Sequence, residues 1–188
     1  MPVAAEPVSY PEEPLILVDA DDRVVGSCAK AECHAGEGLL HRAFSIFLFN
    51  PGGQLLIHQR SAEKPLWPLF WTNSCCSHPR WGETLAQATE RRLGEELGLA
   101  SELTFLYRFQ YHARYLDLGS ERELCSVFAG RVTTVPAVNP AEVADWRYLA
   151  PEEMDRELAL HPDRYTPWCQ MEWRQLRSQL WPRIEELR

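Results

Sequence analysis

A thiol and an imidazole lie two residues apart in the segment from Trp71 to His78, which reads Trp-Thr-Asn-Ser-Cys-Cys-Ser-His. A Glu-rich stretch with the spacing of a helix follows directly, from Gly82 to Gly98. The segment therefore brings together a group that can hold or donate a proton, a metal ligand and a second set of carboxylates. This combination favours an enzyme with a bound metal over a simple binding module.

Further potential metal ligands lie outside this segment. Two of the six residues between His34 and His41 are glycines, Gly36 and Gly38, which predicts a loop rather than a helix there. Glu121 and Glu123 are two residues apart on a predicted strand, so both carboxylates face the same side of it. Taken singly, each histidine is better explained as a surface or core residue, and the spacing of the two glutamates alone favours a solvated strand face.

The Glu-rich helical stretch also carries arginines. Arg92 and Glu96 are four residues apart and share a face, and Arg91 and Glu95 form a second such pair. Ion pairs along an exposed helix are the commoner explanation of this pattern. The stretch nevertheless resembles a Nudix box, a motif that binds Mg²⁺ on a diphosphate. The matching residues are Glu83, Arg91, Leu93, Glu95, Glu96, Gly98 and Leu99, while Ser77 stands where the first Gly belongs.

A second position departs from the Nudix pattern. Arg92 replaces the Glu that follows the motif's Arg, a metal-binding and catalytic position in ordinary Nudix hydrolases. The resemblance therefore implies binding of a Mg²⁺–diphosphate group and argues against diphosphate hydrolysis.

The chain is more specifically similar to one family, the type 1 isopentenyl-diphosphate isomerases. The similarity runs from about Leu15 to Arg177. It is carried by the run Trp-Thr-Asn-x-x-Cys-Ser-His-Pro, the altered Nudix helix, and Glu121-x-Glu123 followed by Leu-Cys. It also includes Cys33-His34 with His41, Arg60 with Lys64, Tyr111, and Thr166-Pro167-Trp168 with Trp173. These motifs are specific together, whereas singly only the Cys-Ser-His-Pro run would be.

The resemblance implies two metal ions and a cationic diphosphate site. A divalent ion would be bound by His34, His41, His78, Glu121 and Glu123; Mn²⁺, Mg²⁺, Fe²⁺ and Zn²⁺ all suit such mixed ligands. Glu96 and the backbone carbonyl of Cys76 would hold Mg²⁺ on the diphosphate. The cations that bind the diphosphate would be Lys30, Arg60, Lys64 and Arg92. Both lysines of the chain belong to this set, although the chain has seventeen arginines.

The implied reaction interconverts isopentenyl diphosphate and dimethylallyl diphosphate, a step of isoprenoid biosynthesis, through a carbocation-like state. Cys76 on one face of the substrate and Glu123, assisted by Tyr111, on the other would add and remove the protons. The ring of Trp173 would stabilise the cation. Cys75 points to the opposite side of its predicted strand, so we expect it in the core.

Two other functions have to be weighed against the isomerase. A Nudix-type diphosphate hydrolase would need another group to replace the carboxylate lost at Arg92. An inactive diphosphate-binding protein is disfavoured because all five metal ligands, Cys76 and Trp173 are present.

These side chains need a sheet and helices to position them. Strands are predicted at residues 15–18, 24–25, 43–50, 54–60, 70–75, 103–113, 121–132 and 146–149, and helices at 84–97, 151–160 and 167–187. Thr84 is the expected N-cap of the first helix and Gly98 its end. The pattern predicts an α/β (α+β) fold, a Nudix-like mixed β-sheet sandwiched between helices. We expect a disordered arm at residues 1–13 and a single isomerase domain at 14–188.

Composition restricts the partners further. The net charge of −8 argues against nucleic acid and an anionic membrane surface. No apolar run reaches the length of a membrane-spanning helix, and the six cysteines lack the spacing of a disulfide framework. We therefore expect a cytoplasmic enzyme with reduced thiols and a small-molecule substrate, acting as a monomer or weak homodimer.

Overall fold

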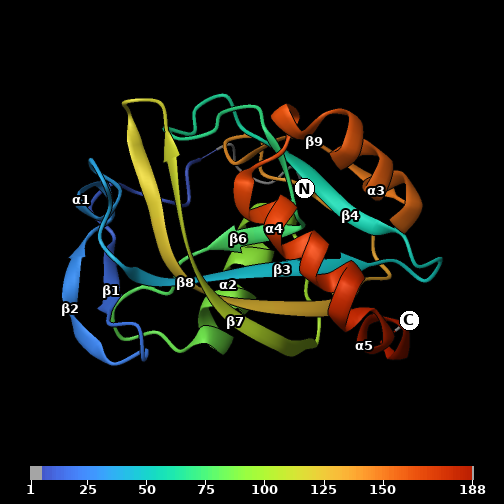
Figure 1. Cartoon of the computed structure of the whole chain (residues 1–188), viewed down its shortest axis with the longest axis horizontal. Helices are drawn as coiled ribbons and strands as arrows, with labels where there is room; N and C mark the ends of the chain where they lie inside the picture. Colours follow the sequence, from blue (N-terminus) through green and yellow to red (C-terminus); the bar gives the residue numbers. More distant parts are fainter. Residues whose placement is uncertain (1–5, 188) are drawn as a thin grey trace.

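Two long strands, β3 (His41–Phe49) and β8 (Gly119–Arg131), form the centre of the protein (Figure 1). In the computed structural model, which describes residues 6–187, they run parallel and pair from His41↔Glu123 to Phe49↔Arg131. Nearly every residue of β3 is buried, in agreement with its continuous apolar sequence. This pairing sets the register between the segments that carry His41 and Glu123.

The remaining strands extend the sheet from this centre. β3 also pairs antiparallel with β1, β4 and β6, β7 forms a long hairpin with β8, and β4 pairs with β5 and β9. Their bounds are β1 Pro14–Val18, β2 Val24–Ala29, β4 Leu55–Arg60, β5 Trp71–Thr72, β6 Cys75–Ser77, β7 Leu103–Tyr115 and β9 Val143–Leu149. The sheet is therefore mixed, as predicted.

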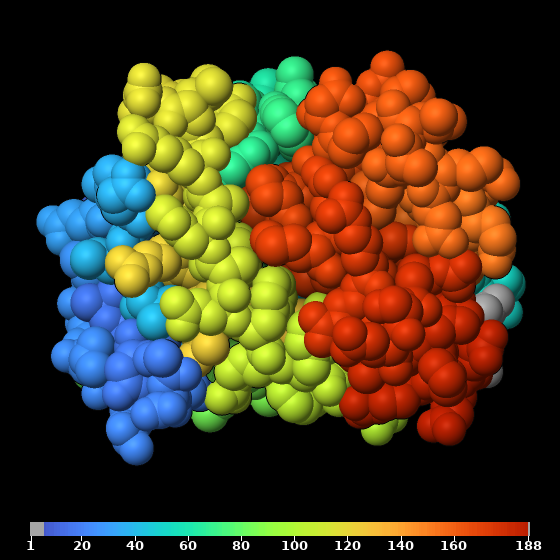
Figure 2. Space-filling model, viewed as in Figure 1, coloured from blue at the N-terminus to red at the C-terminus, as the bar shows by residue number. Residues whose placement is uncertain are grey.

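Helices cover both faces of the sheet. The alternating side chains of β3 separate two hydrophobic clusters, with Ala43 and Phe47 in one and Phe44, Ile46 and Leu48 in the other. The first cluster includes residues of α3 (Pro151–Leu160), α4 (Pro167–Gln175) and α5 (Trp181–Glu186). The second includes residues of α2 (Leu85–Leu97). Figure 2 shows the C-terminal residues covering much of one face. The predicted mixed sheet between helices is confirmed.

Helix α2 begins and ends at the predicted residues. The hydroxyl of Thr84 accepts a hydrogen bond from the Gln87 N–H, and the Gln87 side chain accepts one from the Thr84 N–H. Gly98 ends the helix with φ of 61°, the left-handed region in which glycine has no steric penalty. These local signals determine the bounds of α2, and therefore the side of the helix on which Arg92 and Glu96 lie.

The last predicted helix is interrupted. After α4, residues Leu176–Leu180 form a π-helical segment, and α5 follows from Trp181. Pro182 lies at the start of α5, where its missing N–H cannot continue a regular helix. The sequence pattern also did not predict the short helix α1 (Lys30–Cys33). The loop predicted between His34 and His41 is confirmed.

The N-terminal segment differs from the expectation where the structure describes it. Residues 1–5 of the expected arm lie outside the described residues, but Glu6–Glu13 is held against the domain. The Val8 N–H donates to Glu142 at 3.0 Å, and Asn139 donates to the Glu6 carbonyl at 2.9 Å. A single domain at residues 14–188 stays a prediction. No helix within residues 6–187 is long and apolar enough to cross a membrane.

One carboxyl group of α4 lies inside the core. Glu172 is fully buried; its Oε1 accepts a hydrogen bond from the Cys125 thiol at 3.6 Å, and its Oε2 makes no hydrogen bond. Burial raises the pKa of Glu172 from 4.5 to about 8. The folded protein therefore keeps a proton on Glu172 at pH values where the unfolded chain has released it.

This shift predicts how stability depends on pH. Because the pKa is raised in the folded state, the contribution of Glu172 is fully present below pH 4.5 and is lost as the pH rises to about 8. Each pH unit in this window costs up to about 1.4 kcal/mol. We expect Glu172→Gln to be more stable than the wild type at pH 8 and to lose less stability between pH 5 and pH 8, measured by urea unfolding. The exposed Glu90→Gln variant serves as control, and equal slopes for all three proteins would contradict the prediction.

Candidate active site

Three imidazoles and two carboxylates converge at one end of the central strands. One potential ligand atom from each of His34, His41, His78, Glu121 and Glu123 lies within 4.8 Å of all the others. The three imidazole centroids are 4.8 to 5.1 Å apart. The sequence prediction that these five residues meet agrees with this geometry.

The sheet accounts for the meeting of these side chains. His41 and Glu123 are register partners in the parallel pair β3–β8, and Glu121 lies two residues before Glu123 on the same face. His34 follows α1, and its carbonyl accepts a hydrogen bond from the Ser120 N–H at 2.9 Å. His78 comes directly after β6. Residues far apart in sequence are thus brought together by strand pairing.

The buried atoms of this cluster fit a bound metal ion. The Nδ1 of His34 and of His41 each lie 2.7 Å from a backbone carbonyl, which can only accept, so the Nε2 atoms keep their lone pairs. Four atoms of the cluster are buried without a hydrogen-bond partner: His34 Nε2, His41 Nε2, His78 Nδ1 and Glu121 Oε2. His34 Nε2 and Glu121 Oε2 are 2.7 Å apart without hydrogen-bond geometry. Burying such lone-pair atoms without a hydrogen-bond partner costs free energy unless they bind a cation.

A cavity of about 640 Å³ lies against this cluster. Its wall includes the side chains of Cys76, Tyr111, Glu123 and Trp168, together with the cations Lys30, Arg60, Lys64 and Arg92. Apart from Trp168, every one of these residues was predicted for the site. The cavity thus brings proton-carrying groups and four positive charges together.

Proton-carrying groups line the part of the cavity near the metal ligands. The Tyr111 hydroxyl donates to Glu123 Oε2 at 2.6 Å. Burial raises the pKa of Cys76 to about 12, so its thiol keeps its proton at neutral pH. Cys76 packs against one hydrophobic cluster while Cys75 is fully buried in the other. The prediction that the two adjacent cysteines face opposite sides is confirmed.

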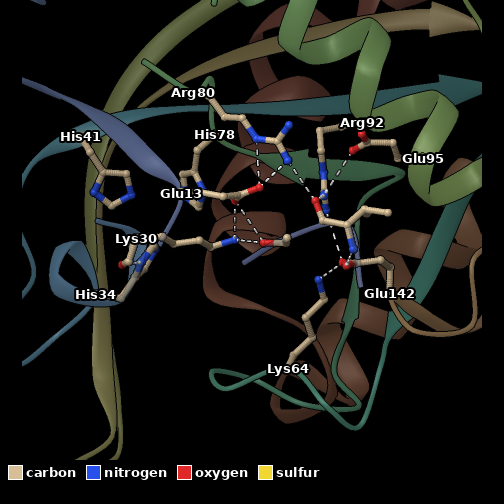
Figure 3. Close-up of polar contacts among 12 residues, drawn as sticks. Glu13, Lys30, His34, His41, Lys64, His78, Arg80, Arg92, Glu95 and Glu142 are labelled. Carbon is tan, nitrogen blue, oxygen red and sulfur yellow. Dashed lines mark hydrogen bonds and ion pairs between the residues drawn. The ribbon is translucent and has the colours of Figure 1, made fainter. Parts of the chain in front are cut away.

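The four cations approach the cavity from different elements, and Figure 3 shows three of them, Lys30, Lys64 and Arg92. Lys30 opens α1, Arg60 ends β4, Lys64 lies in the loop that follows, and Arg92 belongs to α2. Burial and the charges of Lys64 and Arg92 lower the pKa of Lys30 to about 8. Lys30, Lys64 and Arg92 donate hydrogen bonds to Ser9, Glu142 and Glu96, respectively. This accumulation of positive charge suits a polyanionic ligand.

The tryptophan that lines the cavity is Trp168, which corrects the expectation for Trp173. Trp173 is buried in the core, stacks on Phe47 at 6.3 Å and donates its ring N–H to Asp155 at 2.7 Å. Trp168 lines the cavity, 6.3 Å from the Tyr111 ring, with the Arg60 guanidinium 5.4 Å from its own ring. The two tryptophans are five residues apart on α4, so they project in different directions.

Glu96 lies behind the cavity wall rather than on it. Its Oε1 pairs with Arg92, and its Oε2 accepts a hydrogen bond from the Cys75 thiol at 3.7 Å. Two further acidic residues at the cationic end were not predicted, Glu13 and Glu142. Glu13 pairs with Arg80 and Lys30, and Glu142 pairs with Lys64 and Arg92. Neither belongs to a local motif, so no sequence signal pointed to them.

Comparison with known proteins agrees with this arrangement. Residues 39–169 match the NUDIX domain family. The chain is 46% identical over 156 residues to an isopentenyl-diphosphate Delta-isomerase of Nocardia farcinica, covering 82% of this chain and 89% of that protein. It is 44% identical over 163 residues to the protein of the same name from Burkholderia multivorans, covering 86% and 92%. The chain belongs to the isopentenyl-diphosphate Delta-isomerase family.

Solved structures show the same fold. The protein DR0079 of Deinococcus radiodurans superposes with a TM-score of 0.72 at 26% identity, covering 87% of this chain and 98% of that chain. A MutT protein from Methanosarcina mazei has a TM-score of 0.63 at 13% identity, covering 75% and 95%. Membership of the isomerase family therefore accompanies a Nudix fold whose box carries Arg92 at a carboxylate position.

Proposed function

We propose that the protein is an isomerase that interconverts isopentenyl diphosphate and dimethylallyl diphosphate. The main support is that Cys76 and the Tyr111–Glu123 pair line the same cavity as four cations and the buried metal ligands. The names of the isomerase relatives support the same substrate. The reaction moves one proton onto the terminal alkene carbon and removes another from the allylic carbon. It therefore needs two proton-carrying groups and a site from which water is excluded.

The side chains divide this work between the two ends of the cavity. Cys76 and Glu123, the latter with Tyr111, exchange the protons in either direction of the reaction. Trp168 presents an apolar, electron-rich surface to the tertiary cation. The cations Lys30, Arg60, Lys64 and Arg92 bind the diphosphate and orient the hydrocarbon chain toward the other end.

Two divalent ions complete the proposed site. Mn²⁺, Mg²⁺ or Zn²⁺ would be held by His34, His41, His78, Glu121 and Glu123. Glu96 pairs with Arg92 and does not line the cavity, so its carboxylate would have to turn away from Arg92 to hold Mg²⁺ on the diphosphate together with the Cys76 carbonyl. When bound, these ions neutralise the carboxylates and the diphosphate charge. A cytoplasmic location and a monomeric or weakly dimeric state stay predictions.

The hydrolase alternative has less support. Arg92 occupies the position of a Nudix-box carboxylate and is almost completely buried, paired with Glu96 and Glu142. A guanidinium cannot act as the missing base or metal ligand. Release of inorganic phosphate from nucleoside or sugar diphosphates, without isomerisation, would favour the hydrolase.

Deuterium incorporation tests the proposed reaction directly. Purified protein with Mg²⁺ should convert isopentenyl diphosphate into an acid-labile allylic diphosphate, and in D₂O the product should carry deuterium. The exchange reports the proton shift itself, because hydrolysis of the diphosphate would add no deuterium to carbon. Unlabelled substrate recovered after prolonged incubation would contradict the proposal.

The two tryptophans of α4 should differ in effect. A cation–π contact in a dry site is worth about 2 kcal/mol, so we expect Trp168→Leu to lower kcat by roughly thirtyfold with little change in KM. Trp173→Leu should instead lower the midpoint of thermal unfolding, because it removes core packing and the hydrogen bond to Asp155. A larger loss of kcat in folded Trp173→Leu than in Trp168→Leu would reverse the assignment.

A further inference from the structure

Two of the proposed diphosphate ligands meet at one carboxylate (Figure 3). Glu142 Oε2 pairs with Lys64 Nζ and lies 3.3 Å from Arg92 Nη2. Lys64 comes from the loop after β4 and Arg92 from α2, whereas Glu142 directly precedes β9. A single acidic side chain therefore links the two separate elements that supply cations to this end of the cavity.

Glu142 is itself firmly held. Only 2% of the residue is exposed, and its other oxygen, Oε1, accepts the Val8 N–H at 3.0 Å. Its backbone carbonyl accepts the Ser61 N–H at 3.0 Å, and the Ser61 carbonyl accepts the Lys64 N–H at 3.2 Å. Glu142 thus fixes both the side chain of Lys64 and the start of the loop that carries it.

The charge on Glu142 is permanent under ordinary conditions. Burial alone would raise the pKa of Glu142, but Lys64 and Arg92 lower it to about 2. Two cations this close would repel each other without an anion between them. An ammonium has three donors and a guanidinium has five, so both retain donors for a ligand after pairing with Glu142.

The N-terminal segment closes the same arrangement. The Val8 carbonyl accepts from Arg92 at 3.1 Å and from Arg80 at 3.2 Å, while the Val8 N–H donates to Glu142. Pro7, Ser9, Tyr10 and Pro11 line the cavity. Arg92 is consequently held by the Val8 carbonyl, Glu142 and Glu96, and its position does not depend on a bound ligand.

We propose that Glu142 is a positioning residue of the diphosphate site, which holds Lys64 and Arg92 at the spacing that one diphosphate group requires. The inference rests on the proposed function, because that function assigns both cations to the diphosphate. The opposite possibility is that Glu142 competes with the diphosphate for the two cations. The two roles predict opposite changes in affinity when the charge is removed.

Glu142→Gln separates these roles. Lys64 and Arg92 pair with one oxygen of Glu142, and the Val8 N–H pairs with the other. The NH2 group of a glutamine must therefore face either the two cations or the Val8 N–H, and the negative charge between the cations is lost in both cases, so Lys64 and Arg92 should move apart. We expect the dissociation constant for magnesium pyrophosphate, measured by calorimetry on the full chain, to rise about tenfold or more. The KM for isopentenyl diphosphate should rise similarly with little change in kcat, since the side chain of Glu142 pairs with Lys64, Arg92 and Val8 and with none of the proposed proton-carrying groups.

The matched control is Glu157→Gln, which removes the charge from an Arg147–Glu157 pair outside the cavity wall. It should leave both the pyrophosphate affinity and KM unchanged. If Glu142→Gln does not fold, Glu142→Asp replaces it as the test, because it keeps the charge on a side chain too short to reach both cations. The Glu142→Asp protein should bind pyrophosphate more weakly than the wild type. Wild-type or tighter pyrophosphate binding in whichever Glu142 variant folds would overturn the proposal. Absence of turnover in the wild type would instead contradict the proposed function.

Discussion

Cys76→Ala is expected to abolish isomerisation, whereas Cys75→Ala should retain it. The Cys76 thiol lines the cavity near the metal ligands, and no other thiol lines it among the described residues. A positioned acid or base contributes about 10²–10⁴-fold to a rate, and without it one proton of the shift has no donor or acceptor on that face. The measurement is the rate of deuterium incorporation into dimethylallyl diphosphate at saturating substrate.

Cys75 offers a closely matched control because the same atom is removed one residue away. Its side chain lies on the opposite face of β6, fully buried in the cluster with α2. Its loss should reduce the free energy of unfolding by about 1 kcal/mol and leave the turnover near that of the wild type. Equal losses of turnover in the two folded variants would remove Cys76 from the mechanism.

His41→Ala is expected to remove the metal ion and with it most of the activity. His41 is fully buried, and its Nε2 lies 3.6 Å from Glu123, so the variant leaves two carboxylates facing each other with one ligand fewer. A metal ion at a thousandfold excess over its dissociation constant stabilises the folded state by about 4 kcal/mol. The wild type should therefore unfold at a higher temperature with Mn²⁺ than after chelation, and His41→Ala should show a much smaller difference.

Metal content after gel filtration gives a second measurement that does not depend on catalysis. The control is His112→Ala, in which an imidazole is removed from the partly exposed face of β7. This variant should bind as much metal as the wild type and turn over at a similar rate. Retention of the full metal content by His41→Ala would mean that the five-residue cluster is not the metal site.

These experiments address different groups of residues around one cavity. Cys76 and the metal ligands act where protons move, whereas Glu142 acts on the cations that would bind the diphosphate. We therefore expect variants of the first group to lose kcat and variants of Glu142 to lose affinity. The two kinds of loss differ because the proton shift takes place on the hydrocarbon part of the substrate, whereas Glu142 would act on its diphosphate.

Much of the site was predictable because its signals are local. The two-residue period of a strand places Glu121 and Glu123 on one side and separates Cys76 from Cys75. The capping residue Thr84 and the terminal Gly98 define α2, and with it the faces of Arg92 and Glu96. Such features depend on neighbouring residues only, so the sequence determined them, together with the metal-binding and proton-carrying groups and the resemblance to the isomerase family.

Only the tertiary structure decided how distant segments meet. Trp168 and Trp173 share one helix and both are buried, so their sequence could not reveal which ring reaches the cavity. Glu142 is 78 residues from Lys64 and 50 from Arg92. Contacts of this kind depend on strand pairing and loop closure across the whole chain, and they leave no periodic pattern around the residues that make them.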